Sequence, residues 1–456
     1  MYHKNAWEKY KDNQSVVMDF AEDYKRFISI GKTERLAAKE AVKKLEAKGF
    51  RDGLKLKSVK PGDKVYFVNK NKNVAAFVVG EKPLSDGLRI LGAHIDSPRL
   101  DLKEHPIYEA NGFALGDTHY YGGVKKYQYV TIPLALIGVV CKKDGSVVDI
   151  NIGDNPEDPV VGITDLLIHL SADQMQKPLA KAIEGESLDI TLGSIPLPDG
   201  DKGKAVKDNV LKLLKDKYGI EEEDFISAEI EIVPAGPARD YGLDRSMIAG
   251  YGHDDRCCAY PSLMALLDVD KPEYTACCIL VDKEEIGSVG ATGAHSLFFE
   301  NIIAKLAVLS GEGHPVYTAR LALENSRMLS SDVSAGFDPL YAYVSDLKNC
   351  AFLGDGLVFN KYTGSRGKSG SNDSNPEYYA WIRKVMDESD IHWQSSELGK
   401  VDQGGGGTIA YILGNYNMNV IDAGIPVLNM HAPMEVISKV DLYEAYLGYK
   451  AFLLGK

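Results

Sequence analysis

The chain contains 456 residues, of which 45% are hydrophobic and 26% are charged. This ordinary globular composition excludes a disordered tail protein, a collagen-like repeat and a small disulfide-rich scaffold. The 52 basic and 65 acidic residues give a net charge of −13, which argues against nonspecific binding to nucleic acids or anionic membranes. We therefore expect no nucleic-acid partner and no membrane partner.

The first third of the chain predicts helices followed by strands. Apolar residues at helical spacing predict two helices within residues 7–48. Short apolar runs separated by turn residues then predict strands at 65–69, 74–80 and 88–96. The last run is apolar on both faces, which is typical of a strand buried inside a sheet.

The pattern changes between about residue 100 and residue 240. Two apolar runs flank Asp144-Gly145, which predicts a β-hairpin. A charged helix is predicted at 205–218, and the Pro- and Gly-rich stretch 233–242 closes the segment. We predict that residues 99–242 form an inserted β-rich domain.

An alternation of strands and helices returns after residue 245. Together with the N-terminal segment it predicts an α/β fold, with a three-layer domain made of residues 1–98 and 243–456. The expected strands are 276–282, 304–309 and 426–430, and the expected helices are 256–267, 374–388 and 438–454.

Nothing in the sequence indicates a membrane segment. The most apolar stretch, residues 129–140, is well short of the ~20 residues that span a bilayer. Residues 1–14 are polar and lack the apolar core of a signal peptide. The six cysteines include two adjacent pairs and no CxxC spacing, so we expect reduced thiols in a cytoplasmic protein.

Histidines and acids occur at the ends of the predicted strands, where open α/β sheets place their sites. His94 and Asp96 close one strand. An aspartate two residues after a metal-bound histidine could hold the second ring nitrogen of its imidazole. On this pattern alone, His94 could equally be a histidine satisfied within the core.

Two acidic segments allow similar alternatives. Asp254 opens a predicted helix, where it could cap the helix or bridge two metal ions. Glu284 and Glu285 stand between a buried strand and the glycine turn at Gly287. One of the two carboxylates could bind metal while the other accepts a proton, although acidic runs are commonly solvated surfaces.

Asp332 and His431 complete the set. Asp332 lies in a serine-rich segment that could be a cap or turn, and His431 ends the last predicted strand, where it could be a core histidine. Taken together, the five nitrogen and oxygen ligands are typical of a two-metal hydrolytic site. No GxSxG, GxGxxG or GxxxxGK[ST] motif supports serine-hydrolase or nucleotide-binding alternatives.

Along nearly its whole length the sequence resembles the aspartyl aminopeptidase family of cytosolic dinuclear zinc exopeptidases. The resemblance is closest to the bacterial branch, through KYTGSRGKSGSND at 361–373 and the glycine run at 404–407. The five motifs that carry it are GAHIDSPRLD at 92–101, GHDDRCC at 252–258, DKEEIGS at 282–288, SSDVSAG at 330–336 and NMHAPMEVIS at 429–438.

The resemblance implies a zinc-exopeptidase-like α/β/α catalytic domain with two Zn²⁺ per subunit, for which Co²⁺ or Mn²⁺ could substitute. It implies that His94 and Asp332 bind one zinc ion. Glu285 and His431 are implied to bind the other, and Asp254 to bridge both.

The same resemblance implies roles for residues around the metals. Glu284 would be the general base, and Asp96 would orient His94. The segment LLIHL at 166–170 matches a stretch that supplies a histidine to a neighbouring subunit. His169 would then contact the substrate and stabilise the oxyanion in trans. The family forms dodecamers from dimers held by the inserted domain, so we expect a homo-oligomer.

The implied reaction removes the N-terminal residue of a peptide. The family name implies N-terminal Asp or Glu, whose side chain requires a fixed cation. Lys361 matches the family's basic position best, and Arg366 and Lys368 are further candidates, although all three could be solvated loop charges. A Leu-type aminopeptidase, a deacylase or a carboxypeptidase would keep the same ligands. A non-enzymatic self-assembling carrier would have lost a ligand or Glu284, and all are present.

Overall fold

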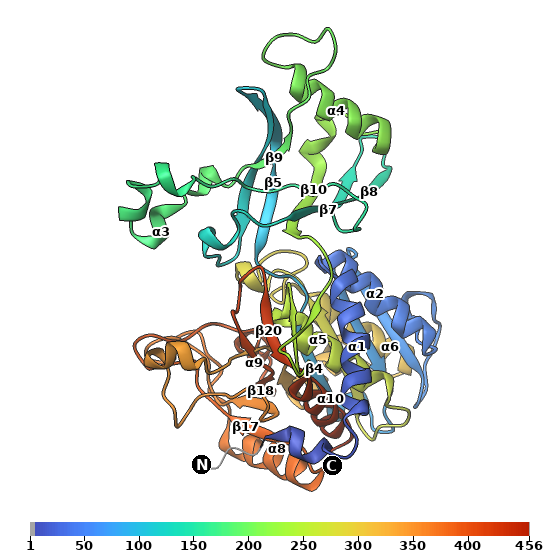
Figure 1. Cartoon of the computed structure of the whole chain (residues 1–456). Helices are drawn as coiled ribbons and strands as arrows, with labels where there is room; N and C mark the ends of the chain where they lie inside the picture. The colour runs from blue at the N-terminus through green and yellow to red at the C-terminus, as the bar shows by residue number, and fades with distance from the viewer. Residues whose placement is uncertain (1–4, 456) are drawn as a thin grey trace. The chain divides into compact units, whose positions relative to one another are not determined.

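The computed structural model describes residues 5–455, which form two compact units. The first unit contains residues 5–97, 238–430 and 435–455, and the second contains residues 98–237 and 431–434. Figure 1 follows the chain through both units. The hydrophobic cores of the two units are separate, and each unit is described by itself.

A mixed nine-stranded sheet forms the centre of the first unit. Its middle strands β13, β4, β14 and β18 run parallel to one another, and every residue of β4 is buried. In spatial order the strands are β1 (Arg51–Asp52), β2 (Lys64–Asn69), β3 (Asn73–Val78), β13 (Thr275–Val281), β4 (Leu88–His94), β14 (Arg327–Ser330), β18 (Asn419–Gly424), β16 (Leu357–Asn360) and β17 (Trp393–Ser395).

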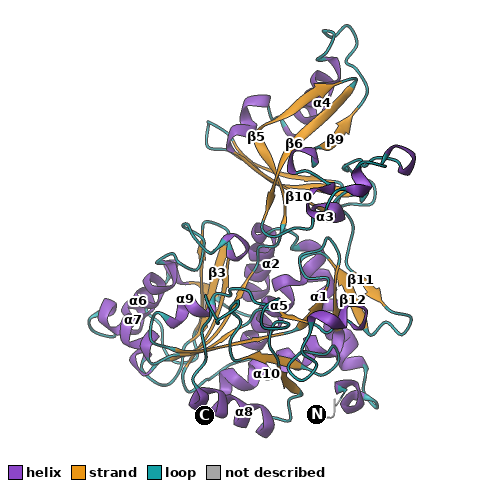
Figure 2. Ribbon diagram, turned by 90° about the vertical axis from the view of Figure 1, so that its left-hand side faces the viewer, coloured by secondary structure: helices purple, strands orange, loops and turns teal. Residues whose placement is uncertain are grey.

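Helices cover both faces of this sheet, so the unit has the expected three α/β/α layers. Alternate strand residues face different cores: Leu91 and Leu329 belong to one, Ile90 and Met328 to the other. Figure 2 shows helices on either side of the strands. The first core includes α1 (Ser15–Ile30), α2 (Glu34–Ala47), α5 (His253–Leu267), α8 (Pro376–Glu388) and α10 (Lys439–Leu454). The second includes α6 (Phe298–Ser310), α7 (Pro315–Glu324) and α9 (Ala410–Gly414).

The strand predicted at 304–309 is wrong, because these residues belong to α6. Phe299, Ile303 and Leu306 recur at helical spacing and are buried on one side of that helix. A short apolar run does not by itself distinguish a buried strand from a buried helix. The strand beside β4 is instead β14, a four-residue segment that gives little periodic signal.

A second sheet in the same unit has five strands, two of which lie next in sequence to candidate site residues. Strand β12 precedes α5, and β15 begins two residues after Asp332. The strands in order are β11 (Arg239–Tyr241), β12 (Met247–Gly250), β20 (Glu435–Ser438), β19 (Pro426–Leu428) and β15 (Ser334–Ala335). No helix within residues 5–455 is long and apolar enough to cross a membrane.

The second unit is an antiparallel six-stranded sheet with helices α3 (Leu179–Ala182) and α4 (Ala205–Tyr218). The helix predicted at 205–218 is confirmed as α4, and the predicted hairpin is the antiparallel pair β7–β8. In spatial order the strands are β8 (Val147–Ile152), β7 (Leu134–Cys141), β10 (Ala228–Pro234), β5 (Arg99–Ala110), β6 (Phe113–Tyr121) and β9 (Ile190–Gly193).

Candidate metal centre

Three neighbouring parallel strands deliver acids and a histidine to one edge of the nine-stranded sheet. His94 is the last residue of β4 and pairs in register with Val281, the last residue of β13. Glu284 and Glu285 begin the short helix η9 (Glu284–Ile286) just beyond β13, and Asp332 follows β14 by two residues. The carboxyl ends of parallel strands meet at one edge, so these side chains converge.

Asp254 reaches the same place from the first turn of α5. Its backbone N–H donates to Glu435 Oε2 at 3.0 Å, and the Ser97 hydroxyl donates to its carbonyl oxygen. These contacts hold Asp254 against His94, whose Nε2 lies 3.1 Å from Asp254 Oδ1. Asp255, by contrast, accepts the backbone N–H of His94 at 3.3 Å. The side chain of Asp254 therefore faces the imidazole of His94, whereas the side chain of Asp255 faces the backbone of His94.

The ligand atoms of these residues lie close enough to hold metal. One atom each from His94, Asp254 and Asp332 lie within 4.8 Å of one another. His94, Glu284 and Glu285 form a second such group, in which Glu284 Oε2 is 3.9 Å from His94 Nε2. Imidazole nitrogen and carboxylate oxygen are ligands that zinc accepts.

The electrostatics of the cluster also favour a cation. Burial alone lowers the pKa of His94, but hydrogen bonds to Asp254 and Asp96 and the charge of Glu284 raise this pKa well above its usual value. Burial raises the pKa of Asp332; His94 lowers it, and the charges of Glu284 and Asp254 raise it further. Buried carboxylates facing one another repel unless a proton or a metal ion stands between them. A divalent metal ion therefore fits this donor set.

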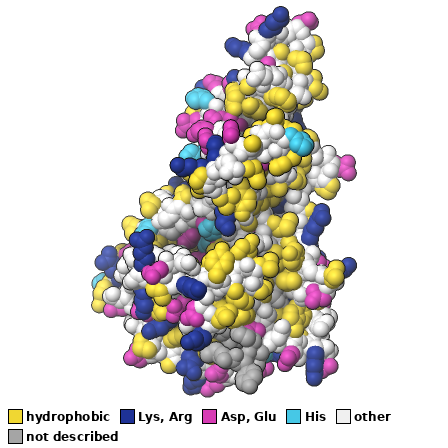
Figure 3. All heavy atoms as spheres, turned by 60° about the vertical axis from the view of Figure 1, so that its left-hand side comes forward, with side chains coloured by type: hydrophobic (Ala, Val, Ile, Leu, Met, Phe, Trp, Pro, Cys, Tyr) yellow, Lys and Arg dark blue, Asp and Glu magenta, His cyan; other side chains and the backbone are white. Residues whose placement is uncertain are grey.

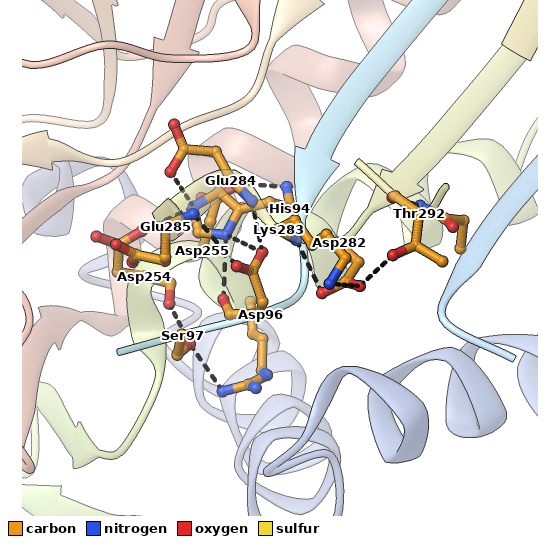
Figure 4. Close-up of polar contacts among 12 residues, drawn as sticks. His94, Asp96, Ser97, Asp254, Asp255, Asp282, Lys283, Glu284, Glu285 and Thr292 are labelled. Atoms are coloured by element: carbon orange, nitrogen blue, oxygen red, sulfur yellow. Dashed lines mark hydrogen bonds and ion pairs between the residues drawn. The ribbon is translucent and has the colours of Figure 1, made fainter. Parts of the chain in front are cut away.

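Asp96 makes further contacts that the sequence pattern did not indicate. Its Oδ1 is 3.3 Å from His94 Nδ1. The same carboxylate also accepts the backbone N–H groups of Glu284 and Glu285, each at 3.2 Å. Dashed lines in Figure 4 mark these contacts. One fully buried carboxylate thus positions a histidine and two glutamates.

Glu435 was also missed by sequence reasoning. It is buried on β20 and accepts the backbone N–H of Asp254, which fixes the first turn of α5. It lies inside the motif at 429–438, but the sequence around an acid in an apolar strand does not indicate which group will donate a hydrogen bond to it. Only the pairing of β12 with β20 brings it to Asp254.

The other three predicted site residues come from other elements of the chain. His431 lies in the loop between β19 and β20, and its Nδ1 is 2.9 Å from the carbonyl oxygen of Gly123 within the second unit. His169 is an exposed residue of the short helix η5 (Ile168–Leu170) in that unit. Lys361 is exposed at the end of β16, and its Nζ lies 3.7 Å from Asp373 Oδ1.

Comparison with known proteins gives a consistent result across the whole chain. The family described as aminopeptidase I zinc metalloprotease (M18) matches residues 27–453. A probable M18 family aminopeptidase 1 of Clostridium acetobutylicum is 55% identical over 99% of this chain and 98% of its own length. The corresponding protein of Thermotoga maritima is 45% identical over 99% of both chains.

Solved structures agree with these relatives. A crystal structure of an M18 aminopeptidase from Thermotoga maritima superposes with a TM-score of 0.96 at 44% identity, covering 100% of both chains. Aminopeptidase I from Clostridium acetobutylicum superposes with a TM-score of 0.92 at 52% identity, covering 99% of both chains.

The fold and the convergent His, Asp and Glu side chains define a metal-dependent hydrolase of the zinc-exopeptidase type. The sequence matches make the assignment specific. This chain belongs to the M18 family of zinc aminopeptidases, which are peptide hydrolases.

Proposed function

We propose that this protein is a two-zinc aminopeptidase that removes N-terminal residues, preferentially Asp or Glu, from peptides. The observation that carries the proposal is the convergence of His94, Asp254 and Asp332 beside Glu284 and Glu285. A single cluster of this composition, with more carboxylates than one metal ion requires, suits two ions that share a ligand.

The proposed ligands divide between the two ions. His94 and Asp332 would hold the first ion, Glu285 and His431 would hold the second, and Asp254 would serve both. The strand pairing supports a contribution from His431: β19, three residues before it, pairs with β15, two residues after Asp332. Other divalent ions, such as Co²⁺ and Mn²⁺, suit the same nitrogen and oxygen donors.

The chemistry requires a base beside the ions. Bound zinc would supply Lewis acidity, which lowers the pKa of water towards neutrality and polarises the scissile carbonyl. The Glu284 side chain is 16% exposed, so a substrate can reach it, and its backbone is fixed by Asp96. Glu284 accepts the proton of the attacking water and passes it to the leaving amine.

An acidic preference requires a cation for the substrate side chain, and a basic loop supplies candidates. A cavity of about 170 Å³ is lined by residues that include Arg366, Lys368 and Lys400. Gly406 donates its backbone N–H to the carbonyl oxygen of Thr363 at 3.1 Å, so the glycine run packs against this loop.

One observation favours the alternative, a neutral or Leu-type preference. Asp373 already pairs with both Lys361, at 3.7 Å, and Lys368, at 3.0 Å. A cation that is partly neutralised attracts a substrate carboxylate less strongly. An acidic preference requires Lys361 to leave Asp373 and pair with the carboxylate of the substrate, whereas a neutral preference does not.

Arylamide substrates distinguish these preferences. We expect the zinc-loaded enzyme to cleave Asp- and Glu-arylamides with higher kcat/KM than Leu-arylamide, and to leave N-acetylated Asp-arylamide intact. In Lys361→Met, the loss of a charge-assisted contact should lower kcat/KM for Asp-arylamide about tenfold and leave Leu-arylamide unchanged. The matched control is Lys384→Met, because Lys384 lies on α8 and pairs at 3.8 Å with exposed Glu388. A wild-type preference for Leu-arylamide would refute the acidic preference, and cleavage of the blocked substrate would refute the aminopeptidase assignment.

The second unit carries features that suit self-association. Exposed apolar side chains surround His169, among them Ile168 and Leu170, each 69% exposed. Figure 3 shows hydrophobic side chains gathered on the visible face of the molecule. A dodecamer is described for a yeast structure, mApe1, that shares this fold at 19% identity. We propose a homo-oligomer built from dimers, in the cytoplasm, with His169 reaching a neighbouring site.

Sedimentation and complementation test this assembly. We expect the wild type to sediment as a dodecamer. Mixing inactive Glu284→Gln with inactive His169→Ala subunits should restore activity, because a neighbour with an intact His169 can then serve a site with an intact Glu284. The alternative result, a monomer of full activity, would contradict both the assembly and the role of His169.

A further inference from the structure

A buried cation lies between acids behind the metal centre. Lys72, in the turn between β2 and β3, places its ammonium 2.9 Å from Glu34 Oε1 and 3.9 Å from Asp282 Oδ2. The side chains of Lys72, Glu34 and Asp282 are 9%, 0% and 1% exposed. Charges this deeply buried are costly unless they are paired, and none of these three residues is among the proposed metal ligands.

Asp282 connects this group to the turn that carries the catalytic glutamates. Its Oδ1 accepts the backbone N–H of Lys283 at 2.8 Å, and its Oδ2 accepts the Thr292 hydroxyl at 2.6 Å. Figure 4 shows Asp282 between Lys283 and Thr292. Asp282 therefore closes the loop from residue 282 to residue 292, and Glu284 and Glu285 lie within that loop.

The hairpin that carries Lys72 also donates hydrogen bonds to the far end of this loop. Asn69 donates its side-chain amide to the carbonyl oxygen of Ala291 at 2.8 Å, and Asn73 donates to that of Thr292. Lys283 adopts a left-handed backbone conformation, with φ +70°, which a β-carbon disfavours. The turn before Glu284 thus depends on outside contacts for its shape.

The charges show why a cation is needed at this position. Burial and the charges of Glu34 and Asp96 raise the pKa of Asp282 to about 6, while Lys72 acts in the opposite direction. Without Lys72, two buried carboxylates would face each other directly behind the turn. Displacement or protonation of Asp282 would relieve this repulsion, and either change weakens the hydrogen bond that it accepts from the Lys283 N–H.

We propose that Lys72 is a positioning residue of the aminopeptidase, which acts through Asp282 on the turn that aims Glu284 and Glu285. The inference rests on the proposed function for the role of Glu284 as base. A shift of 1 Å in a catalytic group can cost up to ~10²-fold in rate, so a partial loss is expected when the support is removed.

Lys72→Met tests the proposal in the full-length enzyme. We expect kcat per bound metal ion to fall about tenfold with KM changed less than about twofold, because the turn and not the substrate contacts is disturbed. Loading with Co²⁺ gives a second readout, since the visible absorption bands should shift if Glu285 moves. Lys72→Arg keeps the charge and should recover most of the rate.

Two comparisons separate positioning from general destabilisation. Lys64→Met is the matched control: Lys64 lies on the same hairpin and pairs at 2.9 Å with Asp270, which is 85% exposed. In an enzyme that already carries Asp282→Asn, Lys72→Met should lower kcat clearly less than it does in the wild type, because residue 282 no longer has a carboxylate to be repelled. Equal losses in both backgrounds, or an unchanged rate per metal ion together with an unchanged cobalt spectrum, would overturn the proposal. If Glu284→Gln keeps the wild-type rate, the proposed function fails instead, and the cobalt spectrum still decides the role of Lys72.

Discussion

Glu284→Gln should lower kcat by about 10²-fold or more, the scale of a lost general base, while zinc content stays at the wild-type level. Glutamine has the size of glutamate and keeps the backbone N–H that donates to Asp96 Oδ1. It cannot accept the proton of the attacking water. Steady-state kinetics on Asp-arylamide, with metal analysis of the same sample, measure both quantities.

Glu300→Gln is the matched control, because the Glu300 side chain is 18% exposed, close to the 16% of Glu284. Glu300 lies on α6 and pairs with Arg320 at 3.3 Å, away from the proposed ligands. We expect its kcat to match the wild type. A Glu284→Gln enzyme that keeps full zinc and loses less than about threefold in kcat would show that another group is the base.

Asp254→Asn should remove at least one zinc ion per subunit and lower kcat at least about 10²-fold. Substitutions that only support a ligand typically cost 10- to 100-fold in affinity or activity, so loss of a shared ligand should cost no less. The cause is electrostatic, because an amide supplies no negative charge to either ion. Metal analysis after dialysis against a defined low free zinc concentration measures the effect.

The control for this substitution is Asp270→Asn, since Asp270 is exposed and pairs with Lys64 at 2.9 Å. It should keep the zinc content and rate of the wild type. Two zinc ions per subunit in Asp254→Asn at the same free zinc concentration would contradict its role as the shared ligand.

Sequence periodicity was sufficient for most of the elements that support the site. The runs at 65–69, 74–80 and 88–96 became β2, β3 and β4, because a strand inside a sheet needs apolar residues on both faces. The same reasoning failed at 304–309. Burial on one side of a helix gives a six-residue window as apolar as a buried strand.

The sequence alone indicated the candidate site residues, but it did not indicate the contacts that support them. His94, Asp254, Glu285 and Asp332 stand at strand or helix ends, where chemistry concentrates in α/β folds. Glu435 contacts Asp254 from about 180 residues away in the chain, and Lys72 lies near Asp282 from about 210 residues away. Such contacts depend on strand order and register, which local patterns do not encode.

The central claim is that two zinc ions bound by this cluster make the chain an aminopeptidase. The most direct test is a zinc titration of metal-free wild-type protein that follows hydrolysis of Asp-arylamide against bound zinc per subunit. The account predicts negligible activity without metal and a plateau at two bound ions per subunit. Full activity with one bound ion, or with none, would contradict it.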